Sequence, residues 1–350
     1  MKDISQAVCG NSNLHGLRVH ARLDQTRALI LRLTRHALRL TLAVGASTAC
    51  AAYPDRPIRL VVPVAPGGAV DVVGRIMAQK MGQLLSQNVV VDNRPGANYI
   101  IGTEVVSKAP ADGYTLLTTA GGHTINPVVY KKLPYDTFRD FTPISHICNS
   151  SGLVIVVHPS VPINTLQQLI DFTRANPGKM IYVSAGWGNS THIAGAQFEA
   201  MAGVKLTHVP HRSAGPAVTD LIGGQVPLMF GPSPVMVPLV QSGRLRPLAF
   251  TGLKRSPQLP NVPTADEAGL KGYESTGWYG LYGPRGMAKP IVDKLSDTVR
   301  QIVQSQDMRE RLAQLNLEPV GSTPEVFAKF LKEDYERYVA VAKAAKIEPQ

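Results

Sequence analysis

Four hydroxyl and imidazole side chains in the middle of the chain are of the types found in hydrolase active sites. They are Ser184, Ser190, Thr191 and His192. A serine or threonine nucleophile needs a neighbouring general base, but Thr191 and His192 follow each other on a predicted helix and so point about 100° apart. The chain also lacks the G-x-S-x-G turn of many hydrolases. We therefore interpret Ser190 and Thr191 as hydroxyls that cap a helix or bind a ligand, and we predict no enzymatic activity.

A pair of histidines further along the chain has the residue types of a metal site. His208 and His211 form it, with His192 or His123 as a candidate third ligand. Residues three apart on an extended strand face opposite sides, and the chain has neither an H-E-x-x-H helix nor a cysteine pair nearby. We predict no metal and no cofactor. His211 and Arg212 instead offer donors just before a predicted helix, where Arg212 is the cation best placed to meet a carboxylate, or is a solvated surface arginine.

Junctions of small residues between strands and helices indicate the binding of an anion. The clearest is the run RLVVPVAPGGAVD at 59–71, which contains Gly67, Gly68 and Asp71. Similar junctions follow the apolar runs at 116–117, 181–183 and 206–209. The first turn of a helix has unpaired N–H groups and a positive dipole end, which glycine and serine loops leave open to an anion. Several such loops facing one cleft would bind a carboxylate without any catalytic group.

The loop at 118–126 follows the apolar run at 116–117. It contains His123 and Asn126 in the sequence TTAGGHTIN. A turn that leads into a capped helix explains its small and polar residues, and so does contact with a ligand. Both interpretations stay open at this point.

Strand-like and helix-like segments alternate almost throughout the chain, which predicts an α/β fold with mainly parallel sheets. A single core of about 300 residues would be large, so we predict two domains joined by a hinge. The first comprises 53–155 plus 275–350, and the second comprises 156–274. Two crossing segments between discontinuous domains suit closure around a ligand.

The N-terminal segment 1–52 has the composition of a secretory signal. Four arginines at 27–39 form a basic stretch, a short apolar run lies at 38–46, and small residues at 46–52 offer A-x-A cleavage sites. We predict export to the periplasm and removal of this segment. Lipidation at Cys50 is a less favoured alternative, because Ser47 fits a lipidation motif poorly.

Charge and hydropathy exclude two classes of partner. Five of the eleven formal positive charges lie in 1–52, and the remaining basic residues are scattered, so we predict no nucleic-acid binding. Beyond the signal, no run of 18 apolar residues occurs, so we predict no direct membrane insertion. Removal of the signal leaves Cys148 as a lone cysteine, which we expect in the core.

Several short blocks of the sequence form a recognisable series. They are PGG at 66–68 with Asp71, VDNRPGA at 91–97, ADGYT at 111–115, KLPYD at 132–136, DFTP at 140–143, ANPGK at 175–179, SAG at 184–186 with Gly188 and His192, RSP at 255–257 and PNVPT at 260–264. In these blocks the chain resembles the Bug-type substrate-binding proteins of tripartite tricarboxylate transporters. The similarity extends from Tyr53 to the C-terminal helix.

The resemblance implies a two-domain periplasmic binding protein of type II-like fold, each domain a mainly parallel sheet flanked by helices. It also implies where the ligand carboxylate binds. The matching positions are Gly67, Gly68 and Asp71 in the first loop, His123 and Asn126 in the second, and Ser184, Gly186, Ser190 and Thr191 in the third.

Several positions depart from the family pattern. Ala69 and Val70 replace a common glycine and threonine, Trp187 replaces a common asparagine, and Pro227 and Gly231 each replace a common aspartate. These changes remove a hydroxyl, an amide and two acids. We expect Val70 and Trp187 to contact the hydrocarbon part of a ligand. An apolar or aromatic carboxylate is therefore expected in preference to an amino acid.

The sequence thus predicts a monomeric extracytoplasmic receptor that binds a small carboxylate and delivers it to the permease subunits of a tripartite tricarboxylate-type transporter. Two alternatives remain. One is an exported ligand sensor that docks to a signalling receptor, and the less favoured one is an exported hydrolase.

Overall fold

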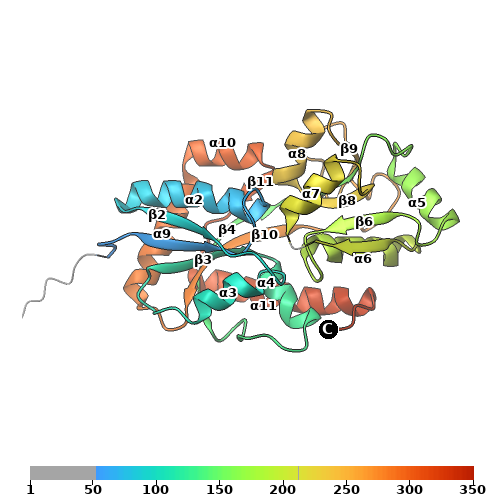
Figure 1. Ribbon diagram of the computed structural model, residues 1–350. Coiled ribbons are helices and arrows are strands. Elements are labelled where there is room, and N and C mark those ends of the chain that lie inside the picture. The colour runs from blue at the N-terminus through green and yellow to red at the C-terminus, as the bar shows by residue number, and fades with distance from the viewer. Residues whose placement is uncertain (1–52, 212) are drawn as a thin grey trace, which may run out of the picture. The chain divides into compact units, whose positions relative to one another are not determined.

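The computed structural model describes residues 53–350 apart from Arg212, and Pro54–Gln350 form one compact unit (Figure 1). The unit contains two β-sheets with helices on both faces, which confirms the predicted α/β class. The predicted signal segment 1–52, with Cys50, lies outside the described residues. Among the described residues, no helix combines the length and the apolar character that a membrane crossing requires.

The first sheet has six strands in the order β11-β4-β10-β3-β1-β2. They are β1 (Ile58–Val62), β2 (Val89–Asn93), β3 (Thr115–Ala120), β4 (Phe141–Ser150), β10 (Gly277–Pro284) and β11 (Leu317–Pro319). β1 runs parallel to β2 and β3, but β10 is antiparallel to β3 and β4, and β11 is antiparallel to β4. The prediction of a mainly parallel sheet was wrong here. Helical crossovers enforce parallel pairing, whereas β4 leads to the other sheet and β10 returns from it.

Helices cover both faces of this sheet. They are α2 (Ala69–Leu85), α3 (Ile100–Ser107), α4 (Gly122–Val129), α9 (Lys289–Gln304), α10 (Gln306–Gln314) and α11 (Pro324–Ala344). Figure 1 shows α2 and α10 on one side and α3, α4 and α11 on the other. Under α3 and α11, Trp278 and Tyr282 of β10 pack with Phe327 in a buried aromatic core. We call this sheet with its helices the first lobe.

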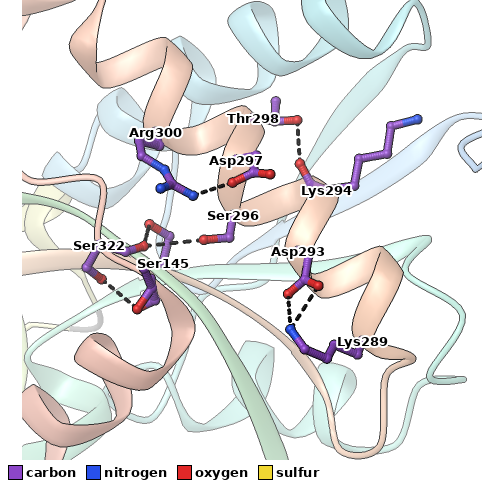
Figure 2. A network of polar contacts seen from close by, with 10 residues as sticks. Ser145, Lys289, Asp293, Lys294, Ser296, Asp297, Thr298, Arg300 and Ser322 are labelled. Carbon is purple, nitrogen blue, oxygen red and sulfur yellow. Dashed lines mark hydrogen bonds and ion pairs between the residues drawn. The ribbon is translucent and has the colours of Figure 1, made fainter.

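Hydroxyl groups tie α9 to the first sheet. Ser145 Oγ in β4 and Ser296 Oγ in α9 both donate to the carbonyl oxygen of Ser322, at 2.8 and 3.4 Å (Figure 2). On the outer side of α9, Lys289 and Asp293 form an ion pair one helical turn apart. The hydroxyl contacts therefore fix the inner side of α9, while charged side chains cover its outer side.

The second sheet has five strands in the order β7-β6-β8-β5-β9. They are β5 (Leu153–Val157), β6 (Ile181–Ser184), β7 (Thr207–Pro210), β8 (Leu228–Pro232) and β9 (Arg246–Phe250). β6 is parallel to β7 and β8, while β5 is antiparallel to β8 and β9. This sheet is also mixed, because β5 enters it directly from the first sheet without a helical crossover.

Four helices flank the second sheet: α5 (Leu166–Ala175), α6 (Ser190–Ala202), α7 (Ala214–Ile222) and α8 (Ser233–Gln241). β5 is apolar at every position because both of its faces are covered. Leu153, Ile155 and Val157 belong to one buried cluster, and Val154 and Val156 to the other. We call this sheet with its helices the second lobe.

The chain passes between the lobes at 151–152 and again in the segment 251–276. The domain boundaries expected from the sequence stay a prediction. Cys148 lies fully buried in β4, and burial raises the pKa of its thiol, as expected for a core residue.

Candidate functional site

Six helices begin at one cavity between the two sheets. The cavity encloses about 50 Å³ and is lined by both lobes. Its lining includes the following residues at helix starts: Gly68, Ala69 and Val70 for α2, Tyr99 for α3, Gly121 for α4, Asn189 and Ser190 for α6, Ser213 and Ala214 for α7, and Pro232 for α8. Loops at the ends of strands thus converge on one point, as is usual for ligand sites in α/β sheets.

Most of these helix starts have no side-chain cap. The N-cap residues of α2, α3, α4, α7 and α8 make no capping hydrogen bond through their side chains. In α6, by contrast, Asn189 Oδ1 accepts from the backbone N–H of Thr191 at 3.1 Å. An uncapped start presents N–H groups and a partial positive charge. Five such starts at one cavity form a site suited to an anion.

The side chains that line the cavity are electrically neutral. Among the described residues, no Lys, Arg, His, Asp or Glu belongs to the lining. Its side chains with polar groups are Asn98, Tyr99, Ser150, Asn189, Ser190, Ser213, Trp278 and Tyr279, and the rest of the lining is small or apolar. An anionic ligand would therefore meet N–H and O–H donors.

The residues predicted from the sequence divide into two groups. Gly68, Val70 and Ser190 line the cavity. The other predicted residues that the structure describes do not belong to the lining. Most of them contact the loops that form the cavity. Arg212 lies outside the described residues.

Asp71 fixes the loop before α2. Its buried carboxylate accepts from the backbone N–H of Gly67 and from Arg75 Nε, both at 2.9 Å, and from Asn93 Nδ2 at 2.8 Å. Burial acts to raise the pKa of Asp71, but the hydrogen bonds from Arg75, Asn93 and Gly67 outweigh it and lower that pKa. The carboxylate therefore stays charged and holds Gly67 in its left-handed conformation, with φ at 83°.

Neutral groups fix the loop before α6. Thr191 Oγ1 accepts from the backbone N–H of Ala185 at 3.0 Å and donates to Asn189 Oδ1 at 3.1 Å. Ser184 Oγ lies 2.6 Å from His208 Nε2. The hydroxyls of Ser184 and Thr191 therefore shape the loop, whereas Ser190, the first residue of α6, lines the cavity.

Trp187 turns away from the cavity onto a stack of imidazoles. Its ring lies 4.4 Å from that of His192, and the His192 ring lies 4.2 Å from that of His208. Gly186 and Gly188 on either side have φ values of 133° and 70°, which only glycine adopts readily. Burial lowers the pKa of His192 to about 4 and, with His192 nearby, that of His208 to about 3. Both imidazoles are therefore neutral near pH 7.

His123 and Asn126 lie on α4 behind the cavity. The His123 ring packs 4.7 Å from Tyr282, centroid to centroid, and burial lowers its pKa to about 4. Asn126 Nδ2 donates to the carbonyl of Asn98 at 2.8 Å, and Asn98 Nδ2 donates to Asn126 Oδ1 at 2.6 Å. Asn126 therefore supports Asn98, which lines the cavity, whereas His123 belongs to the core.

Two further predicted residues have structural roles. His211 Nε2 lies 2.7 Å from Asp220 Oδ2 on α7. Gly231 is buried in β8, where an added Cβ would lie 2.4 Å from the side chain of Met236. Gly231 thus lets α8 pack closely against the strand.

Most of the lining has no counterpart in the sequence-based prediction, and this includes the polar or large side chains of Asn98, Tyr99, Asn189 and Trp278. Asn189 stands directly before a predicted helix, which is a recognisable N-cap signal. Trp278 arrives from a strand near the other end of the chain. Asn98 and Tyr99 lie at a strand-to-helix junction that has no run of small residues after Ala97.

A family model for the tripartite tricarboxylate transporter family receptor matches residues 73–347. Over 303 residues the chain is 40% identical to the "UPF0065 protein in tcbD-tcbE intergenic region" of Pseudomonas sp. strain P51, covering 86% of this chain and 90% of that one.

Three solved structures are similar throughout. R. palustris Rpa4515 with adipate has a TM-score of 0.83 at 34% identity, covering 85% of this chain and 100% of that one. The periplasmic binding protein BugD has a TM-score of 0.82 at 34% identity and the same coverage. MatC from Rhodopseudomonas palustris with bound malate has a TM-score of 0.78 at 30% identity, covering 83% and 99%.

Proposed function

Because the chain belongs to the tripartite tricarboxylate transporter receptor family, we propose that it is a periplasmic receptor that binds a small carboxylate and delivers it to membrane permease subunits. Family membership confirms that the protein is a solute-binding protein and not an enzyme. Signal removal at 1–52 and a monomeric state form part of the proposal.

One observation carries the choice of ligand. Five helices present uncapped N-termini to a cavity that, in the described part of the chain, has no charged side chain in its lining. Such a site favours an anion through N–H groups and helix dipoles. Adipate and malate, which accompany two of the similar structures, are both carboxylates. Gly68, Val70 and Ser190 are the proposed direct contacts, and Asp71, Ser184 and Thr191 hold their loops.

A matched pair of ligands tests this proposal. Adipate and 1,6-hexanediol share a six-carbon chain, but only adipate carries carboxylates. A ligand that binds only the native state raises the melting temperature, so we expect a rise with adipate, malate or benzoate and none with the diol. Equal shifts with adipate and the diol, or no shift with any acid, would contradict the proposal.

The lining also favours an apolar acid over an amino acid. In the described residues no carboxylate faces the cavity to pair with a ligand amine. We expect calorimetric titration to show tighter binding of benzoate than of aspartate. The reverse order would contradict this choice of ligand and leave the carboxylate site itself in place.

Delivery to a permease needs its own test. A closed form presents a surface that the open form lacks, and a ligand shifts the population according to its differential affinity. We expect uptake of the bound acid into vesicles that contain the permease subunits only when the receptor is added. Uptake at the same rate without the receptor would contradict a delivery role.

A further inference from the structure

The loop that leads into α3 has an unusual backbone. Ala97, Asn98 and Tyr99 are three successive non-glycine residues with positive φ, at 46°, 47° and 74°. Side chains rarely adopt this conformation, and it persists only where surrounding contacts enforce it. Asn98 and Tyr99 both line the cavity, whereas Ala97 does not. The strain therefore places two side chains at the ligand site.

The ring of Tyr99 takes up space between the loop and α4. A Cβ added to Gly122 would lie 2.3 Å from Tyr99 Cδ2 and 2.4 Å from Cε2, so the ring packs directly against the glycine backbone. Tyr99 forms one wall of a cavity of about 50 Å³, far smaller than the roughly 300–1,000 Å³ usual for drug-sized ligands. A smaller residue at this position would enlarge the cavity.

The hydroxyl of Tyr99 is oriented from the other lobe. Asn189 Nδ2 donates to Tyr99 Oη at 3.0 Å and to Asn98 Oδ1 at 3.1 Å. Because the amide is the donor in this bond, the phenolic proton stays available for another acceptor. Burial raises the pKa of Tyr99, which keeps that proton in place. Val70, also in the lining, supplies no hydroxyl.

We propose that Tyr99 is a specificity-determining contact of the ligand: its hydroxyl, held across the lobes by Asn189, donates to the carboxylate, and its ring limits the size of the acid. This inference rests on the proposed carboxylate-binding function. Asn189 acts as a positioning residue, because it orients the Tyr99 hydroxyl.

Two tyrosine-to-phenylalanine variants separate ligand contact from lobe closure. Tyr130 hydroxyl also bonds across the lobes, to the carbonyl oxygen of Trp187 at 3.2 Å, but Tyr130 does not line the cavity. Calorimetry with the tightest binder among acetate, malate, adipate and benzoate should show Kd raised about 10- to 100-fold in Tyr99→Phe, as for loss of a hydrogen bond to a charged group. Tyr130→Phe should change Kd less than about threefold.

A glycine pair tests the limit on size. Tyr99→Gly removes the ring and relieves the positive φ, whereas Ala97→Gly relieves φ alone. We expect the preference for adipate over acetate to rise at least about tenfold in Tyr99→Gly, as for several extra methylenes accommodated, and to stay within about twofold of wild type in Ala97→Gly. Melting temperatures without ligand check that all variants fold.

The outcomes distinguish this inference from the function on which it rests. If wild type binds none of the four acids, the carboxylate function fails, and the assignment of Tyr99 fails with it. If wild type binds but the two phenylalanine variants lose affinity equally, the Tyr99 hydroxyl acts only through closure and the contact is refuted. If the adipate-to-acetate ratio of Tyr99→Gly matches that of Ala97→Gly, the size limit is refuted.

Discussion

The two lobes hold their cavity loops by different physical means. In the first lobe, the charged Asp71 receives bonds from Gly67 and Arg75 behind the start of α2. In the second lobe, neutral groups hold the loop before α6. Thr191 Oγ1 accepts from the N–H of Ala185, and the uncharged rings of His192 and His208 stack on each other. Acid removes the charge of the Asp71 carboxylate, whereas it adds charge to the imidazoles of His192 and His208. We therefore expect the two cavity loops to be destabilised at different pH values.

Acid should open the second-lobe loop first. Burial lowers the pKa of His192 and His208 from 6.5 to about 4 and about 3. Between pH 6.5 and 4 the unfolded chain therefore binds protons that the folded chain does not. Stability falls as pH falls through this window, by up to about 1.4 kcal/mol per pH unit for each histidine. The folded pKa of Asp71 lies below 3.8, so its contribution is lost only at lower pH.

Hydrogen exchange at pH 7 and pH 5, corrected for the intrinsic rate, compares the two loops. We expect protection at 184–192 to fall more than protection at 65–75. His123 and His146 in the first lobe also have pKa values lowered to about 4 by burial, so global stability will drop as well. The variant His192→Gln should lessen the pH dependence. Equal loss of protection in both loops would contradict the expectation that acid destabilises the second-lobe loop first.

Removing the charged anchor should produce the next largest effect. Asp71→Ala removes the carboxylate that accepts from the N–H of Gly67, the amide of Asn93 and the guanidinium of Arg75. We expect a loss of about 2–4 kcal/mol in the free energy of unfolding, measured by urea denaturation. Asp71→Asn is the matched control, because it keeps one oxygen acceptor and should lose less. A loss below about 1 kcal/mol in Asp71→Ala would show that the loop does not depend on this carboxylate.

The cap of α6 should matter less. Asn189→Ala removes the acceptor for the N–H of Thr191 and should lower the free energy of unfolding by about 1–2 kcal/mol. Asn189→Asp keeps the cap but loses the donor to Tyr99, so it should retain most of the stability while weakening ligand binding. Denaturation and calorimetry on both variants measure the two effects. Equal destabilisation by alanine and aspartate would contradict a capping role.

Sequence reasoning predicted the fold better than it predicted the site. The strand-to-helix junctions at Gly68 and Ser190 were recognisable because small residues follow apolar runs, and both residues line the cavity. Strand direction was harder to predict. A continuous apolar run is typical of parallel strands, but β5 has one because both of its faces are buried, although it is antiparallel to both neighbours. Helix α8 is also hard to predict, because Pro234 and Pro238 indicate a loop although the first lies in the first turn, where a proline is tolerated.

The parts of the site that could not be predicted depend on backbone conformation and long-range contacts. Tyr99 reaches the cavity through three successive positive φ values. Asn98 is of a type that favours this conformation, but Ala97 and Tyr99 are not. Trp187 was expected at the ligand, but the turns at Gly186 and Gly188 direct its ring onto His192. Such placements follow from tertiary packing, which residue spacing along one chain does not encode.

The smallest expected effect tests what the charge of the first-lobe anchor contributes. The Arg75 side chain is 53% exposed beside the buried Asp71, so solvent screens their attraction. In Arg75→Gln, Asp71 keeps its bonds from Gly67 and Asn93, and we expect a loss of at most about 1 kcal/mol in urea denaturation. Loss of the guanidinium should also raise the pKa of Asp71, because Arg75 lowers it, so acid unfolding should begin at higher pH. If Arg75→Gln destabilised the protein as much as Asp71→Ala, the ion pair itself would hold the loop before α2. The neutral donors Gly67 and Asn93 would then not be enough to hold that loop.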